Sequence, residues 1–151
     1  MMLTMESFAQ DVPVWKINEL EKVMAGRDSV TVINFWATWC KPCVHELPGL
    51  QKAAEALAGK PVKFLFVSLD FKRELQDRLI PFVKNTGFKQ KVVLLDEPDY
   101  NSWIDKVHPS WSGAIPATIV INNSGKKELY EKEMTEAELM KAAEAALGAL
   151  K

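Results

Sequence analysis

Two cysteines, Cys40 and Cys43, are the only cysteines in this chain of 151 residues, and two residues separate them. They follow Val30–Trp36, an apolar run rich in β-branched and aromatic residues that predicts a buried strand. Apolar residues at helical spacing after the pair predict a helix over Cys40–Leu57. A Cys-x-x-Cys pair where a buried strand leads into a helix is typical of a dithiol–disulfide redox site.

The position of Cys40 at the start of the predicted helix favours its thiolate. A free thiol with a pKa of about 8.5 is ionised to only about 3% at pH 7. The unpaired N–H groups and the dipole of a helix start stabilise an anion, and Lys41 adds positive charge. Cys43 lies one turn further along and faces the core. We therefore expect Cys40 to be the nucleophile and Cys43 to be the resolving thiol, which opens the mixed disulfide.

Two other interpretations of the cysteine pair are weaker. Packing of two cysteines in a core explains neither their spacing nor their place at a strand–helix junction. A zinc site requires four ligands, and beyond the pair the chain offers only His45 and His108, which form no second ligand pair. We therefore expect no metal site and no bound cofactor.

The composition excludes several classes of protein. Hydrophobic residues make up 48% of the chain, which suits one compact domain, and the net charge of −1 favours neither nucleic acid nor an anionic membrane. Two cysteines cannot form a scaffold of several disulfides. The longest apolar stretches are strand-sized, so no membrane span is predicted. The first ten residues lack the basic and apolar regions of a signal peptide.

The order of the predicted elements indicates an α/β fold. Residues 1–11 are expected to be a loose lead-in and residues 12–151 a single domain. Strands are predicted over Val12–Lys16, Val30–Trp36, Val62–Leu69, Val92–Leu95, Ala117–Ile121 and Lys126–Glu131. Helices are predicted over Glu19–Ala25 (with Asn18 as N-cap), Cys40–Leu57, Arg73–Thr86, Tyr100–Val107 and Glu136–Leu150. This order predicts a mixed sheet with helices on both faces.

Three features resemble the thioredoxin superfamily. They are the segment Trp39–Cys43, the proline five residues after the second cysteine (Pro48), and Ile115-Pro116 before a strand. The resemblance extends from about Val12 to Leu150. It implies a thioredoxin-like fold in which the Ile115–Pro116 bond is cis and lies against the disulfide.

Within that superfamily the chain looks most like the TlpA/ResA-like branch of bacterial cell-envelope oxidoreductases. The segment Asn34–Cys40 is that branch's form of the motif, and Glu46 stands where ResA-like proteins carry an active-site glutamate. The long segment between Leu69 and Ala114 suits its central insertion, next to an N-terminal extension. Asn34 replaces the buried aspartate of plain thioredoxin and cannot titrate, so another group must handle protons.

Glu46 is the candidate for that role. On a helical wheel it lies at the edge of the apolar stripe, where partial burial would raise its pKa and let it move the proton of Cys43. The alternative is a solvated helix glutamate. His45, on the opposite side of the helix, is expected to face solvent.

The residues around the pair are expected to contact a protein substrate. The tryptophans could instead belong to the core, although Trp39, on a tight turn, is expected to be exposed. The candidate substrate-binding residues are Trp39, Lys41, Pro42, Trp111, Ile115 and Pro116.

The resulting hypothesis is a thiol–disulfide oxidoreductase that acts on protein thiols and disulfides and is reduced by an upstream redox partner protein. The resemblance implies a reductant in the periplasm or cell envelope, although the Lys-Pro dipeptide does not fix the redox direction. The alternatives are a cytoplasmic thioredoxin substitute and a non-catalytic thioredoxin-fold binding module. A peroxidase would need a peroxidatic cysteine motif that the sequence does not contain.

Overall fold

A mixed sheet of six strands in the order β1-β4-β3-β2-β5-β6 forms the centre of the computed structural model, which describes residues 11–148. The strands are β1 (Val14–Trp15), β2 (Val30–Trp36), β3 (Val62–Ser68), β4 (Lys91–Leu95), β5 (Ala117–Ile121) and β6 (Lys127–Tyr130). β1, β4, β3 and β2 are parallel neighbours, whereas β5 and β6 continue the sheet in antiparallel pairing.

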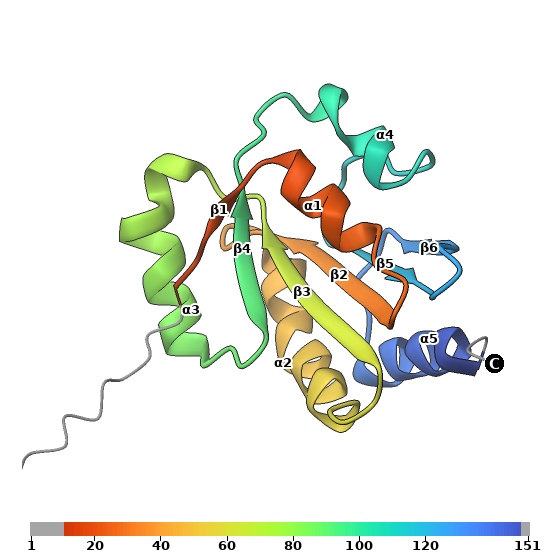
Figure 1. Cartoon of the computed structure of the whole chain (residues 1–151). Helices are drawn as coiled ribbons and strands as arrows, with labels where there is room; N and C mark the ends of the chain where they lie inside the picture. The colour runs from red at the N-terminus through yellow and green to blue at the C-terminus, as the bar shows by residue number, and fades with distance from the viewer. Residues whose placement is uncertain (1–10, 149–151) are drawn as a thin grey trace, which may run out of the picture.

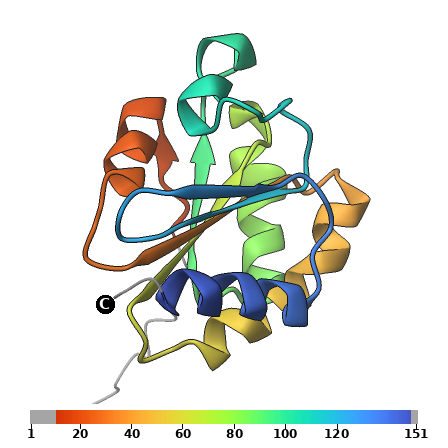
Figure 2. The same ribbon diagram turned by 90° about the vertical axis from the view of Figure 1, so that its right-hand side faces the viewer.

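Helices cover both faces of this sheet (Figures 1 and 2). They are α1 (Ile17–Met24), α2 (Lys41–Ala56), α3 (Ile80–Thr86), α4 (Ile104–Val107) and α5 (Glu136–Gly148). The residues between β3 and α3 form a 3₁₀ turn and a π turn, and a further 3₁₀ turn precedes α4. Helices α2, α3 and α5 pack on one face, and α1 and α4 on the other. This arrangement confirms the expected thioredoxin-like fold.

β2 lies in the middle of the sheet, and all seven of its residues are buried. Val32 and Trp36 face the core under α2, whereas Ile33 and Phe35 face the core under α1 and α4. A strand covered on both faces is largely apolar, which explains this sequence apart from the buried polar residues Thr31 and Asn34. The cysteine pair therefore follows a strand that is buried along its whole length.

The segment between β3 and β5 contains α3, β4 and α4, and it forms the expected central insertion. β4 lies between β3 and β1 and pairs in parallel with both. α4 covers the far face of the sheet, where Trp103 packs 6.4 Å from Phe35 between ring centroids. The insertion thus widens the sheet and adds loops at the end where β3 and β4 finish.

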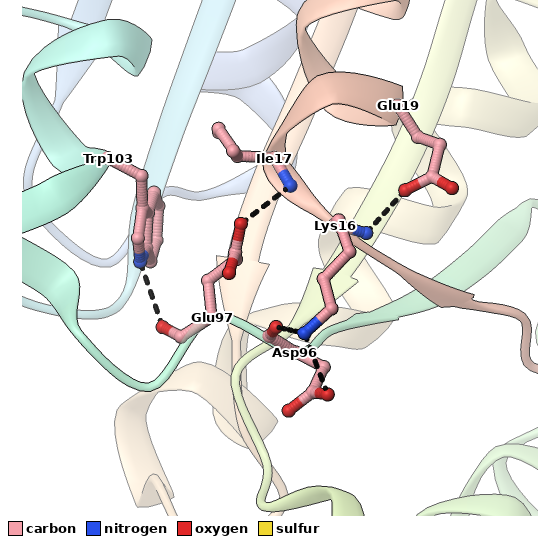
Figure 3. Close-up of polar contacts among 6 residues, drawn as sticks. All are labelled: Lys16, Ile17, Glu19, Asp96, Glu97 and Trp103. Atoms are coloured by element: carbon pink, nitrogen blue, oxygen red, sulfur yellow. Dashed lines mark hydrogen bonds and ion pairs between the residues drawn. The ribbon is translucent and has the colours of Figure 1, made fainter.

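α1 begins at Ile17, two residues earlier than the sequence predicted, and its N-cap is Lys16 rather than Asn18. The Glu19 carboxylate accepts a hydrogen bond from the Lys16 N–H. The Ile17 N–H donates to the Glu97 carboxylate at 3.0 Å, and this partner from the insertion satisfies the first turn (Figure 3). The contact between Ile17 and the distant Glu97 therefore determines where α1 begins.

Two further expectations concern the N-terminal lead-in and a membrane-spanning helix. The lead-in predicted over residues 1–11 lies, apart from Asp11, outside the described residues. Among residues 11–148, none of the helices has the length and apolar character that a membrane crossing requires.

Candidate active site

Cys40 and Cys43 form a disulfide at the start of α2, with their Cα atoms 5.2 Å apart. Cys40 is the N-cap residue of α2, and Cys43 lies within the first turn. Cys40 is 7% exposed, whereas Cys43 is fully buried. The outer position belongs to the residue expected to be the nucleophile, and the inner position belongs to the expected resolving thiol.

The start of α2 suits an anion at Cys40. The helix is 16 residues long, and its first turn contains no acidic residue. Lys41 and Pro42 are both exposed beside the disulfide. After reduction, the helix dipole and the Lys41 charge therefore both favour the thiolate of Cys40.

The loop before β5 lies against the disulfide. The first residue of β5, Ala117, is opposite Phe35 of β2, which brings the preceding residues to the start of α2. The Cys40 Sγ lies 3.9 Å from the carbonyl oxygen of Ile115. The Ile115–Pro116 peptide bond is cis, the conformation that the resemblance implied, and Pro116 is buried.

The two candidate tryptophans lie in different environments. Trp39 is 48% exposed beside Cys40, in line with the expectation for a surface residue. Trp111 belongs to the core instead: it is 3% exposed, and its ring centroid lies 4.5 Å from that of Phe35. Its Nε1–H donates to the Ala114 carbonyl oxygen at 3.0 Å. The structure thus corrects the expectation that Trp111 contacts the substrate, because its buried ring supports the loop before β5.

Glu46 is buried more deeply than the helical wheel suggested, with 3% of its surface exposed. Its Oε2 accepts a hydrogen bond from Asn34 Nδ2 at 3.0 Å, and its Oε1 accepts one from the Met134 N–H at 3.1 Å. Burial raises the pKa of Glu46 to about 7, against the lowering effect of these two hydrogen bonds. A carboxyl group one turn after Cys43 therefore changes its protonation near neutral pH.

A cleft of about 300 Å³ gives Glu46 a border with the solvent. His45, Gly49 and Met134 also line it, together with Glu133. His45 itself is exposed, as expected, and its ring contacts the Glu133 carboxylate, which raises the pKa of the imidazole. This cleft offers a path by which a proton on Glu46 can exchange with water.

Asn34 connects Glu46 to the sheet. Its Nδ2 also donates to Thr118 Oγ1 of β5 at 3.0 Å. Within residues 11–148 its Oδ1 accepts no hydrogen bond, although it is buried. Asn34 thus links the Glu46 carboxylate on α2 to Thr118 on β5.

The sequence analysis missed Asp70, which is buried at the end of β3. Its carboxylate accepts hydrogen bonds from the Thr38 N–H at 3.0 Å, from Thr38 Oγ1 at 2.5 Å and from Ser68 Oγ at 2.6 Å. These bonds fix the turn between β2 and Cys40. An acidic residue directly after a buried strand, at the same sheet edge as the cysteines, was the signal available for finding it.

The described residues, 11–148, contain no cluster of three histidine, cysteine, aspartate or glutamate side chains that could hold a metal ion.

Comparison with protein families gives a match over residues 7–127 to the AhpC/TSA family. The chain belongs to this family. It is 27% identical over 124 residues to thioredoxin-like protein YneN of Bacillus subtilis, an alignment that covers 80% of this chain and 67% of that protein.

Two further relatives have names that describe thiol–disulfide chemistry. The thiol-disulfide oxidoreductase ResA of Geobacillus thermodenitrificans is 27% identical over 71% of this chain and 57% of its own length. A secreted thiol-disulfide isomerase from Corynebacterium glutamicum superposes with a TM-score of 0.65 at 26% identity, over 81% of this chain and 72% of that chain. The chain thus spans only about half to two thirds of the curated relatives it matches.

Proposed function

We propose that this member of the AhpC/TSA family is a thiol–disulfide oxidoreductase that exchanges dithiols and disulfides with protein substrates. The observation that carries the proposal is the disulfide itself, which joins Cys40 at a helix start to the fully buried Cys43. The names of the relatives support the same chemistry.

In the reducing direction the reaction proceeds in two exchanges. The Cys40 thiolate attacks one sulfur of the substrate disulfide, that S–S bond breaks, and the leaving sulfur takes up a proton. Cys43 then loses its proton and attacks Cys40 Sγ, which releases the second substrate thiol. Two electrons have moved to the substrate, and Cys40 and Cys43 are joined in a disulfide.

Glu46 is the base for the second exchange. It lies one turn after Cys43 on α2, and its carboxyl group changes protonation near pH 7. A base with a pKa near the working pH accepts a proton effectively and returns it readily. The cleft beside Glu46 then passes the proton to solvent.

The residues around Cys40 receive the substrate chain. Trp39, Lys41 and Pro42 are exposed on one side of the disulfide, and Ile115 is half-buried on the other. Pro116 holds the Ile115 carbonyl, 3.9 Å from Cys40 Sγ, where it can accept a hydrogen bond from an extended substrate.

The direction of electron flow is towards the substrate, and an upstream dithiol protein restores the reduced form. The cell envelope is the compartment, a location supported by the relative described as secreted. The reduction potential tests the direction: a value near about −270 mV supports a reductant, and one near about −120 mV an oxidant. Fractionation of cells tests the compartment, and recovery in the cytoplasm would contradict it.

Reduction of insulin by dithiothreitol tests the activity. The protein should accelerate the reaction, and Cys40→Ser should abolish the acceleration, because it removes the attacking sulfur. Wild-type protein that gives no acceleration over dithiothreitol alone would favour the non-catalytic binding module instead.

A further inference from the structure

We infer that a cleft beside Trp39 is a specificity subsite that takes a large apolar side chain of the substrate polypeptide. The cleft has a volume of about 310 Å³, and its apolar lining comes from Trp39, Leu69, Phe71, Leu95, Pro98 and Tyr100. The inference rests on the proposed function and assigns part of its substrate preference.

The cleft lies at the same end of the strands as the disulfide, which is the edge of the sheet formed by their carboxyl ends. β2, β3 and β4 are parallel neighbours, so their carboxyl ends meet at that edge. The cysteine pair follows β2, and the cleft is formed by the residues after β3 and β4. Trp39 lines the cleft and directly precedes Cys40. A polypeptide attacked at Cys40 therefore brings its neighbouring residues over the cleft.

Exposed aromatic residues are concentrated around this cleft. Trp39, Phe71 and Tyr100 are 48%, 50% and 39% exposed, and they are the exposed large apolar side chains within residues 11–148. All three line the cleft. Exposed apolar surface gathered in one place, rather than scattered, marks a binding surface.

The side of the cleft that the insertion forms, with Asp96 and Glu97 after β4, is held in place by hydrogen bonds in the free protein (Figure 3). The Lys16 ammonium donates to the Asp96 carbonyl oxygen at 2.8 Å and contacts the Asp96 carboxylate at 3.1 Å. The Glu97 carbonyl oxygen accepts a hydrogen bond from Trp103 Nε1 at 2.9 Å, and the Glu97 carboxylate accepts one from the N–H of Ile17. The cleft is therefore preformed, which lowers the entropic cost of binding.

The charged groups in the lining favour an apolar occupant over a basic one. The carboxylates of Asp70, Asp96 and Glu97 already accept hydrogen bonds from this chain. A positive charge, Lys72, also lines the cleft. The Arg73 guanidinium lies 4.6 Å from the ring centroid of Phe71, so this ring already has a cation beside it. The part of the cleft lining that remains available to a ligand is thus aromatic and aliphatic.

Mixed disulfides of three short peptides with glutathione test this inference. Each peptide has one cysteine, flanked on both sides by phenylalanine, by lysine or by serine. Reduced protein attacks the peptide sulfur through Cys40 and releases glutathione, and Cys43 then releases the peptide thiol as the protein disulfide forms. The second-order rate constant is measured for each peptide.

We expect wild-type protein to react roughly tenfold faster with the phenylalanine peptide than with the serine peptide, as an apolar pocket discriminates. Phe71→Ser and Tyr100→Ser should each lower this ratio severalfold. Tyr130→Ser is the matched control, because Tyr130 is a partly exposed tyrosine on the edge strand β6, three strands away from β3, and does not line the cleft. It should keep the wild-type ratio. Circular dichroism verifies that each variant is folded, and Phe71, which is half exposed, is the safer substitution.

The outcomes separate this inference from the proposed function. Equal rates with all three peptides, or a preference for the lysine peptide, would overturn the apolar subsite and leave the oxidoreductase activity standing. A wild-type preference that both cleft variants retain would also overturn it. Failure of reduced wild-type protein to react with any peptide would instead contradict the proposed function.

Discussion

Asn34 and Glu46 form a buried hydrogen-bonded pair, in which Asn34 Nδ2 donates to Glu46 Oε2 over 3.0 Å. Both side chains are 3% exposed. Asn34 lies on β2 and Glu46 on α2, so the pair joins the strand before the cysteines to the helix that carries them. Burial raises the pKa of Glu46 to about 7 despite the hydrogen bonds that it accepts. The site thus contains a buried carboxyl group with a raised pKa, although β2 itself has no acidic residue.

The first prediction concerns the pH dependence of the second exchange. Glu46→Gln keeps the shape of the side chain and removes its titration. We expect resolution by Cys43 to be at least about tenfold slower in this variant at pH 7, since a positioned base contributes that much or more. The decay of a preformed mixed disulfide, followed by mass spectrometry from pH 5 to pH 9, measures the effect.

In the wild type this decay should accelerate as Glu46 ionises around pH 7. The thiols and the carboxyl group titrate together, so the observed pKa values belong to the group. Glu55→Gln, at an exposed position on α2, is the control. Superimposable profiles for wild type and Glu46→Gln would show that Glu46 has no part in the proton transfer.

The second prediction concerns stability. The pKa of Glu46 rises from 4.5, its ordinary value, to about 7 in the folded protein. Between these two values the folded state binds more protons than the unfolded state, so the free energy of unfolding falls as the pH rises. The contribution of this group is fully present below pH 4.5, and it decreases by roughly 3 kcal/mol once the pH exceeds about 7.

Urea denaturation of the oxidised protein between pH 4.5 and pH 8 measures this change. Glu46→Gln should lack the decline, and it should therefore gain stability relative to wild type as the pH rises. An equal decline in both proteins would mean that the carboxyl group is not the source.

The third prediction concerns Asp70. Asp70→Ala leaves the Thr38 N–H and two hydroxyl groups without their acceptor, and each unsatisfied buried group costs about 1–3 kcal/mol. We expect a loss of at least about 2 kcal/mol in the free energy of unfolding. Asp70→Asn, which keeps one acceptor oxygen, should lose less. Asp77→Ala, at an exposed position, is the control. Equal stability of Asp70→Ala and Asp77→Ala would contradict the role of Asp70 in fixing the turn.

The fourth prediction concerns Lys41. Lys41→Glu replaces a positive charge beside Cys40 with a negative one at a helix start that otherwise has no acidic residue. We expect the pKa of the Cys40 thiol to rise, because the added negative charge disfavours the thiolate at the helix start. Thiolate absorbance of reduced Cys43→Ser protein, with and without Lys41→Glu, measures the shift. A pKa that does not change would mean that the helix start alone stabilises the thiolate.

The sequence was sufficient for the parts of the site that depend on local order. The apolar run of β2, the cysteine spacing and the stripe on α2 each follow from periodicity within one element, and they place Cys40 outside and Cys43 inside. The depth of Glu46 was not predictable in this way, because the segment at Met134 covers it from far along the chain.

Other features were missed for the same reason. Trp111 is buried because Phe35 and Trp103 pack against it, and neither is its neighbour in the sequence. Asp70 acts through Thr38, 32 residues earlier. α1 begins two residues early because Glu97 supplies an acceptor. Contacts between distant segments decide each of these cases, and no local pattern records them.

Trapping of a mixed disulfide tests the central claim most directly, namely that Cys40 attacks and Cys43 resolves. Reduced Cys40→Ser and Cys43→Ser proteins are each mixed with oxidised insulin, and the products are separated without reductant and weighed by intact mass spectrometry. The account predicts a stable adduct through Cys40 in Cys43→Ser and little adduct in Cys40→Ser, because Cys43 is fully buried. An adduct that accumulates in Cys40→Ser, with none in Cys43→Ser, would contradict the account.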